Sequence, residues 1–397
     1  MKSFAWSIVS RIAINPSTYC RILPSHSKLW GTLLLGLAVL LSQGCAEERG
    51  ITPAPTNYHA VLLTTDALVY QEYMIQILDL GTDSITGEIP IDVGATIPRG
   101  IALTRDGRYC AAFHGTGTVQ VLDLQSLTVS HEMSLSRPEA TSVHFLPDDS
   151  LKLFMSCRIT CSSAVYDLST GAVDTSLPGS RFGFSSPDQS ELVAISSGGI
   201  TRRMYDTWEI VDSFSFVSPL GGGVHASEAA VSSAYDGIYL MGEDASGGAL
   251  FRYDLSDHSC TFRQPVWFRP PQALGRNSVA VSPDGREIWV LQPGGKYQSP
   301  PRENEYWGYI LILDGLTGVP LDTIRDAEYW EQSPEYPLFL TAIEFHPDEP
   351  FAYVAAYSDS PSMVVIDRST REIVGSFDVG YVREIVISPP RKTSGHY

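Results

Sequence analysis

The sequence is poor in basic residues. It holds 27 Lys and Arg against 45 Asp and Glu among 397 residues, and its formal net charge is −18 at pH 7. A nucleic-acid binder needs a basic surface to neutralise phosphates, and adsorption to anionic lipid head groups needs the same sign of charge. The composition therefore argues against both kinds of partner.

Enzyme signatures are also missing. The sequence contains no G-x-S-x-G, no H-E-x-x-H, no P-loop and no paired C-x-x-C motif. The nine histidines are scattered singly, and two of them, His114 and His225, fall on the face that we expect to be functional. Two histidines do not make a metal site without a third ligand. We expect no metal and no cofactor, and a non-catalytic role is favoured over an enzymatic one.

Cysteine is scarce, with six residues in the chain. Cys157 and Cys161 lie between two strand-like runs, and a hairpin would bring them opposite each other, so a disulfide is expected in an oxidising compartment. A metal site at this C-x₃-C is poorly supported because no second Cys or His pair accompanies it. Cys110 and Cys260 lie within strand-like runs and are expected to be packed free thiols.

The chain begins with a segment that has the features of an export signal. Residues 1–44 carry four basic residues and no acid, and Leu29 to Ser42 form an apolar run that is too short for a comfortable membrane span. The run ends at small residues before Cys45, which resembles the lipobox of bacterial lipoproteins, where the cysteine is lipidated. The position of Leu41, one place further from Cys45 than usual, and the long region before the run depart from that pattern. A plain signal peptide with Cys45 incidental is the alternative.

Either interpretation predicts an exported protein. Residues 45–56 are short, polar and proline-bearing, and they read as a tether. Without the leader, 23 basic and 45 acidic residues remain, a net charge of −22. We expect membrane contact through the lipid anchor only, on the periplasmic or cell-surface side.

A strand that ends on an aspartate recurs seven times. The clearest copy, Thr118–Leu124, alternates in character, ends on Asp123 and is followed by a polar turn and another strand. The seven aspartates are 44, 44, 39, 48, 60 and 53 residues apart, within and above the ~40–50 of a propeller blade; they are Asp79, Asp123, Asp167, Asp206, Asp254, Asp314 and Asp367. We expect each to accept main-chain N–H bonds in its turn rather than to form a catalytic ring.

A second marker interleaves with these aspartates in strict order. It is a turn such as Ser282–Gly285, which joins the first two strands of each unit. The unit therefore has four strands, called a, b, c and d, with the aspartate at the end of strand c. The first unit has a strand b at Tyr58–Thr64 but no strand a, and the chain ends on an unpaired strand a, Tyr381–Ile387. The sequence thus predicts an all-β, seven-bladed β-propeller over residues 57–390, closed by its C-terminal strand and followed by a tail over residues 391–397.

These motifs resemble YVTN-type bacterial propellers, a group that includes quinoprotein amine dehydrogenase β-chain-like and lactonase-like folds. The resemblance rests on Ser282-Pro283-Asp284-Gly285 and on the Val/Ile-x-Val/Ile-x-Asp that ends strand c, and it covers essentially all of residues 57–390. It implies a blade architecture and no particular chemistry. WD40 repeats fit less well because neither Gly-His nor Trp-Asp recurs.

Two candidate sites fall on the face that carries the d–a and b–c loops. At the start of strand a, successive blades present Arg99, Glu139, Arg181, His225, Arg276 and Arg383, and four arginines at one channel mouth would attract an anionic ligand. Alternatively, some of them point into blade interfaces and pair with carboxylates. Three long loops add aromatic residues suited to a carbohydrate or a protein partner, unless they only pack the loops: Trp267, Tyr297, Tyr306, Trp307, Tyr329 and Trp330.

The sequence favours a monomeric, lipid-anchored propeller that binds an unidentified ligand or protein through this face. The alternative is a lactonase-like hydrolase with its site at the channel mouth, for which His225, Arg276 and Arg383 would be the first residues to mutate. A third hypothesis, an accessory role in a redox system, rests on the fold alone, which is a poor guide to function.

Overall fold

The computed structural model describes the part of the chain that forms the repeated units. The described residues are 58–65, 73–91, 98–114, 118–134, 140–146, 152–157, 163–177, 179–186, 190–231, 236–266, 278–292, 309–325, 339–357 and 362–388. The predicted leader, tether and Cys45 lie outside them. No helix among the described residues is long and apolar enough to cross a membrane.

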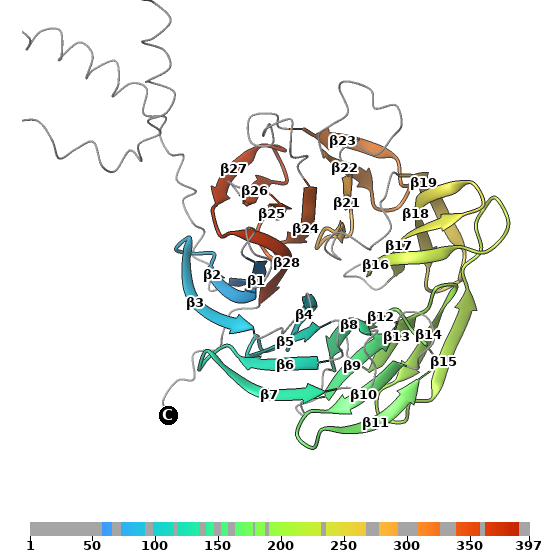
Figure 1. Cartoon of the computed structure of the whole chain (residues 1–397). Helices are drawn as coiled ribbons and strands as arrows, with labels where there is room; N and C mark the ends of the chain where they lie inside the picture. Colours follow the sequence, from blue (N-terminus) through green and yellow to red (C-terminus); the bar gives the residue numbers. More distant parts are fainter. Residues whose placement is uncertain are drawn as a thin grey trace, which may run out of the picture. The chain divides into compact units, whose positions relative to one another are not determined.

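The described strands form seven antiparallel sheets of four strands each, arranged in a ring (Figure 1). Blade 1 consists of β28 (Tyr381–Ser388), β1 (His59–Thr65), β2 (Tyr73–Asp79) and β3 (Ser84–Ile91); blade 2 of β4 (Pro98–Leu103), β5 (Tyr109–His114), β6 (Thr118–Asp123) and β7 (Thr128–Ser134); blade 3 of β8 (Ala140–Phe145), β9 (Lys152–Cys157), β10 (Ser163–Asp167) and β11 (Ala172–Leu177).

The remaining blades repeat the pattern. Blade 4 consists of β12 (Phe182–Ser185), β13 (Glu191–Ile195), β14 (Gly199–Met204) and β15 (Ile210–Ser215); blade 5 of β16 (His225–Val231), β17 (Gly237–Asp244), β18 (Gly247–Asp254) and β19 (Cys260–Pro265); blade 6 of β20 (Val279–Val281), β21 (Glu287–Gln292), β22 (Tyr309–Asp314) and β23 (Pro320–Ile324); blade 7 of β24 (Phe339–Phe345), β25 (Phe351–Tyr357), β26 (Met363–Asp367) and β27 (Ile373–Phe377). The predicted seven-bladed architecture is confirmed.

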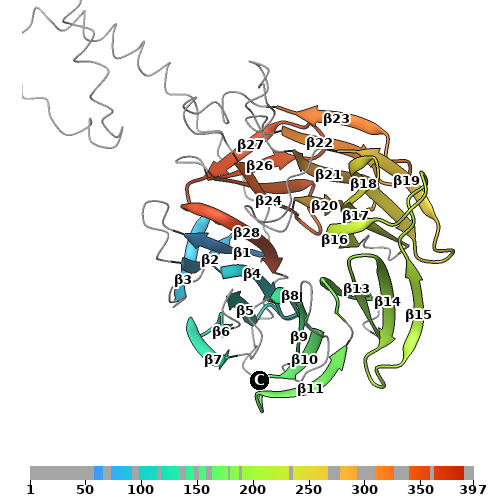
Figure 2. The same cartoon turned by 45° about the vertical axis from the view of Figure 1, so that its right-hand side comes forward.

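The C-terminal strand closes the ring as predicted. β28 pairs with β1 in antiparallel fashion, with Leu62 opposite Ile385, and it supplies the inner strand of blade 1 (Figure 2). The first and last described strands of the chain therefore share one sheet. This closure removes the open inner edge that a sheet of this kind would otherwise expose.

The core lies between neighbouring blades. Side chains on β1 alternate between two hydrophobic clusters: Ala60 and Leu62 pack toward blade 7, while Val61 and Leu63 pack toward blade 2. Neighbouring blades cover both faces of the inner strands, so the sequences of these strands are nearly continuous apolar runs. The outer strands are more exposed, as in β7, where five of the seven residues are exposed. Cys110 is buried in the cluster between blades 1 and 2, and Cys110 and Cys260 are both free thiols as predicted.

Six of the seven repeated aspartates cap their own turns. Asp167 illustrates the arrangement, because its Oδ1 accepts the main-chain N–H groups of Ser169 at 2.8 Å and Thr170 at 3.2 Å. The Ser169 hydroxyl and these N–H donors lower the pKa of the Asp167 carboxyl. The same turns form after five other strands, at Asp79, Asp123, Asp254, Asp314 and Asp367. The structural interpretation is confirmed for these six.

The prediction for Asp206 is wrong. Met204 takes the place of the aspartate in blade 4: it pairs with Glu191, and its carbonyl accepts the N–H of Trp208 at 2.9 Å, as the carbonyl of Asp167 accepts that of Gly171 at 2.8 Å. Asp206 lies two residues further on, in the turn. The ladder register decides which residue ends the strand. The prediction chose Asp206 because an aspartate ends strand c in the other blades.

The residue four places after each strand-c end adopts a left-handed conformation in all seven blades. Its φ lies between 53° and 70°, although only two of the seven are glycine: Asp83, Leu127, Gly171, Trp208, His258, Gly318 and Arg371. The preceding blade is contacted by the side chains of Leu127, Trp208, His258 and Arg371. This contact offsets the backbone strain. His258 Nε2 lies 2.8 Å from Asp212 Oδ2, and its ring stacks on Phe214 with centroids 4.4 Å apart.

Gly318 shows the other solution at this position. Any Cβ at Gly318 would come within 2.5 Å of the Phe262 ring of blade 5, so no side chain fits there. In blade 7 the equivalent Arg371 reaches Glu287 of blade 6, with Nη1 2.9 Å from Oε2, and its guanidinium lies 5.4 Å from the Trp289 ring centroid. Each turn is thus fitted to its neighbour.

Candidate functional site

The inner strand of most blades carries a β-bulge near its N-terminal end. In β4, β8, β16, β24 and β28 the register skips one residue near the start of the strand. In β12 the residue before the strand, Arg181, donates its N–H to the Ile195 carbonyl at 2.5 Å, and Phe182 pairs with the same Ile195. Two residues facing one partner is the pattern of a bulge, which re-aims side chains at a sheet edge.

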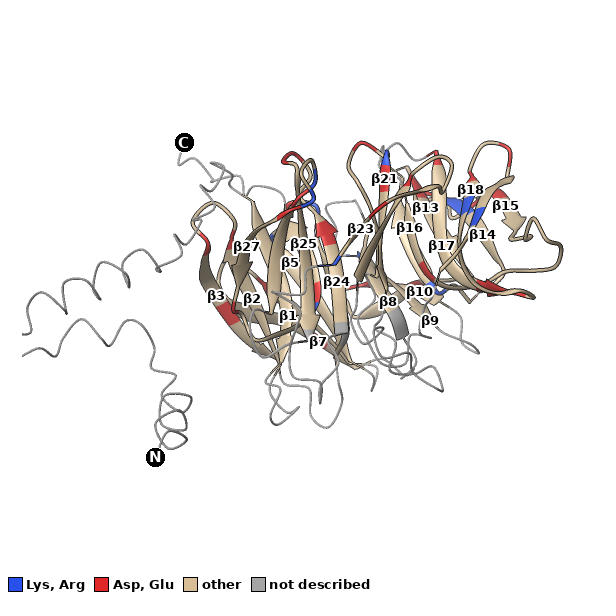
Figure 3. Ribbon diagram, turned by 90° about the horizontal axis from the view of Figure 1, so that it is seen from above, with Lys and Arg blue, Asp and Glu red and all other residues tan. Residues whose placement is uncertain are grey.

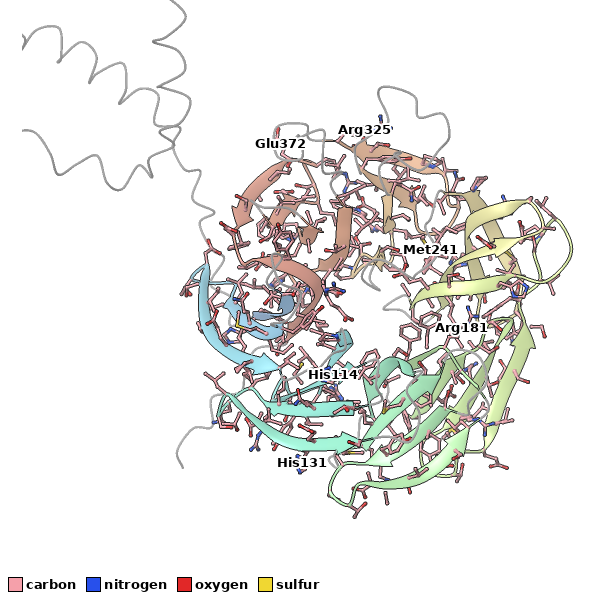
Figure 4. All side chains as sticks on the ribbon, viewed as in Figure 1. His114, His131, Arg181, Met241, Arg325 and Glu372 are labelled. Carbon is pink, nitrogen blue, oxygen red and sulfur yellow. The ribbon has the colours of Figure 1, made fainter. Side chains whose placement is uncertain are left out.

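Three of the predicted arginines occupy this bulge position. Arg383 is the skipped residue in blade 1, Arg99 in blade 2, and Arg181 has the equivalent place in blade 4. All three therefore lie at the same end of their inner strands, on the face of the d–a and b–c loops. The side chain of Arg99 is outside the described residues. Figure 4 shows Arg181 and His114 on the inner side of the ring and His131 on its outer side.

Arg181 links three blades. Its Nη1 donates to the Ala226 carbonyl of blade 5 at 2.6 Å. Its own carbonyl accepts the hydroxyls of Ser142 at 3.0 Å and Ser156 at 2.6 Å, both from blade 3. Part of the guanidinium therefore has a structural role, and its acceptor is a main-chain carbonyl rather than the carboxylate that the alternative interpretation expected.

Arg383 has a different environment. Its guanidinium carbon lies 5.5 Å from the ring centroid of Tyr73, the first residue of β2. The Nε atom is buried and has no hydrogen-bond acceptor. A cation held against an aromatic face differs from Arg181, whose Nη1 donates to a main-chain carbonyl.

The other predicted contact residues fall in different places. His225 is exposed as the first residue of β16, two residues before the bulge, and so does not share the arginines' position. The remaining predicted residues lie outside the described residues: Glu139, Arg276, Trp267, Tyr297, Tyr306, Trp307, Tyr329, Trp330 and Cys161. Cys157 ends β9, but its side chain is likewise outside them.

Two glutamates that follow the bulge were not anticipated. Glu384 Oε2 accepts the N–H of Ile101 in blade 2 at 2.9 Å, and Glu228 Oε1 accepts the N–H of Ser278 in blade 6 at 2.9 Å. Gly100 permits the first contact, since a Cβ there would lie 2.9 Å from Glu384 Oε2. Alignment of the seven inner strands on their bulges is the signal that would have found both carboxylates.

Two further titratable side chains, Glu344 and His144, lie on inner strands. Burial, with the negative charge of Glu384 adding to it, raises the pKa of Glu344 on β24 to about 8. Burial lowers the pKa of His144 on β8 to about 4, and its Nε2 lies 2.6 Å from Ser185 Oγ. Near neutral pH, therefore, His144 is uncharged and Glu344 is mostly protonated.

A buried ion pair of blade 5 bonds Ser218 in the d–a loop between β15 and β16. The carboxylate of Asp244 is 1% exposed, and it accepts Arg263 Nε at 2.7 Å and Ser218 Oγ at 2.6 Å. The Arg263 guanidinium lowers the pKa of Asp244 far below its usual range. Leu220, in the same loop, is 67% exposed. Blade 5 thus presents an apolar side chain on an ordered loop at the predicted binding face.

The opposite face carries both carboxylates and basic side chains: Arg108 lies 3.1 Å from Asp123, and Arg368 lies 2.6 Å from Asp284. This face carries the c–d turns with the repeated aspartates, and Figure 3 shows acidic residues in several of the turns along one edge of the ring. The bulge arginines lie at the other end of the same inner strands. No group of three or more His, Cys, Asp or Glu residues suited to a metal ion occurs among the described residues.

Comparison with known proteins supports the fold. No family model and no curated protein matches the sequence. The solved structure of dihydro-heme d1 dehydrogenase NirN in complex with DHE is similar, with a TM-score of 0.55 and 16% identity over 83% of this chain and 65% of the NirN chain. The β-propeller domain of Myceliophteria thermophila Cps50 (Swd1) matches with a TM-score of 0.53 and 13% identity, over 78% of this chain and 97% of that domain.

At these identities the similarity concerns the fold alone. The chain spans 65% of the length of NirN, so NirN also contains regions without a counterpart here. The narrower YVTN-type resemblance stays a prediction. The sheet topology and both solved structures agree that the chain is a seven-bladed β-propeller.

Proposed function

We propose that this propeller is a non-catalytic binding module of the cell envelope that receives an anionic ligand or partner at the face of the d–a and b–c loops. The observation that supports this most directly is the shared bulge position of Arg99, Arg181 and Arg383 in three blades. Three arginines at one mouth of the ring, in a chain of net charge −18, favour anions there. The fold is compatible with such a role, since propellers present loops from every blade around one axis.

The binding test uses the full chain extracted in detergent and citrate as an anionic probe. We expect isothermal titration calorimetry to show saturable citrate binding that weakens as ionic strength rises. The triple substitution Arg99→Gln, Arg181→Gln and Arg383→Gln should weaken it at least tenfold, because each lost charge-assisted hydrogen bond is worth about 1.5–3 kcal/mol. Arg105→Gln, in an exposed turn on the opposite face, is the matched control and should leave it unchanged.

Two results would contradict this proposal. One is an affinity for citrate that the triple substitution leaves unchanged. The other is hydrolysis of a lactone that is lost on His225→Ala, because it would make the protein an enzyme of the lactonase-like kind.

The envelope location rests on the leader and Cys45. We propose that Cys45 is lipidated and that residues 45–56 tether the propeller to the membrane. The substitution Cys45→Ser should move the protein from the membrane fraction to the soluble fraction, because a propeller of net negative charge has little attraction for anionic lipid. Immunoblotting of the two fractions measures this, and continued membrane retention of the variant would exclude the anchor.

A further inference from the structure

Arg383 stands apart from the other arginines that are at least partly buried. Within the described ranges, seven such arginines donate to a carbonyl, hydroxyl or carboxylate acceptor: Arg181, Arg202, Arg203, Arg252, Arg263, Arg368 and Arg371. Arg383 donates to no described residue, and its buried Nε lacks an acceptor. A guanidinium that is partly removed from water and left unpaired is costly. We therefore infer that the acceptor for the Arg383 guanidinium is not part of the propeller.

Tyr73 adds a second unfilled donor. The residue is 1% exposed, and its hydroxyl has no hydrogen-bond partner. The hydroxyls of two other deeply buried tyrosines find carbonyls: that of Tyr239 bonds Gly315 at 2.8 Å, and that of Tyr253 bonds Val217 at 3.0 Å. A buried hydroxyl without a partner is uncommon in folded proteins. Two donors without acceptors thus meet in one cation–π contact.

The ladder register brings the two donors together on blade 1. Tyr73 lies opposite Thr65 on β1, and Thr65 lies opposite Tyr381 on β28. Arg383 follows two residues later, as the bulge residue, and reaches across β1 to the Tyr73 ring. This end of blade 1 faces the d–a and b–c loops. The pair therefore belongs to the proposed binding face.

We propose that Arg383 and Tyr73 form a subsite for one oxyanion group, a carboxylate or a phosphate, of the bound ligand. One oxygen would accept the Arg383 Nε–H and another the Tyr73 hydroxyl. An anion suits the subsite better than a neutral group because the guanidinium has no carboxylate partner among the described residues, and the adjacent Glu384 already bonds Ile101 of blade 2. This subsite rests on the proposed function and defines which end of the ring's inner strands receives the charged group.

The test compares inorganic phosphate and citrate on the full chain in detergent, by calorimetry. Tyr73→Phe keeps the ring and removes the hydroxyl, so it should weaken the preferred probe about tenfold. Arg383→Lys keeps the charge and removes the Nε donor, and a similar loss is expected. Tyr109→Phe, on the strand end at the opposite face of blade 2, should change nothing. The probe that loses affinity tells whether the group is a carboxylate or a phosphate.

A second readout separates binding from folding. Removing an unsatisfied buried hydroxyl should raise the melting temperature of the empty protein, so Tyr73→Phe should be more stable and yet bind less tightly. If both variants bind like the wild type while the triple arginine variant does not, the subsite is wrong and the proposed function stands. If the wild type binds neither probe, both are overturned.

Discussion

Truncation after Gly380 is expected to abolish the folded ring. The deletion removes β28, the inner strand of blade 1, which bonds β1 along its whole length. Val382 and Ile385 are fully buried against blade 7, and each such side chain contributes about 1.5–3 kcal/mol. Glu384, which bonds blade 2, is lost as well. Together these losses approach the ~5–15 kcal/mol of total stability that a protein domain has.

The truncated protein should also aggregate, because the bared edge of β1 is a template for pairing with other chains. Circular dichroism melting and size-exclusion chromatography measure both effects. Truncation after Ser388 is the matched control, since it keeps every residue of β28. A soluble monomer that melts like the wild type after loss of residues 381–397 would show that the first blade does not need its C-terminal strand.

Glu344→Gln should stabilise the protein at alkaline pH by about 2–4 kcal/mol, the lower figure allowing for partial exposure of the side chain. The folded-state pKa of Glu344 is raised from its ordinary 4.5 to about 8 by burial and by Glu384. As the pH rises, the unfolded chain therefore releases the Glu344 proton at a lower pH than the folded chain does. Below pH 4.5 the group has no effect on stability, and between pH 4.5 and 8 the wild type loses stability as pH rises.

Because glutamine cannot ionise, residue 344 of the variant should contribute a constant amount to the free energy of unfolding between pH 4.5 and 8. Urea unfolding at pH 5, 6, 7 and 8 measures the difference, which should grow with pH. Glu372→Gln, an exposed carboxylate in the c–d turn of the same blade, is the control and should run parallel to the wild type. A difference between Glu344→Gln and wild type that is constant across pH would mean that Glu344 is ionised in the folded protein at every pH tested.

Part of the candidate site could be found from the sequence. Arg99, Arg181 and Arg383 were identified because each stands at the start of a repeated strand. Their common bulge position could not be, since a bulge appears only when two strands are aligned in register. The pairing of Arg383 with Tyr73 was also out of reach, because more than 300 residues separate them in the sequence and only ring closure brings them into contact.

The sequence by itself determined the number of blades, their four-strand pattern and the closure of the first blade by a C-terminal strand, predicted as Tyr381–Ile387. These follow from local chemistry, namely alternation along strands and turns that begin at an aspartate, repeated at a fixed period. The tertiary structure alone decided that Met204 replaces an aspartate, that the left-handed turn residues fit the preceding blade, and that Arg383 lacks an acceptor. Each of these depends on which residues of another strand or blade lie opposite, and that is set by packing across the ring.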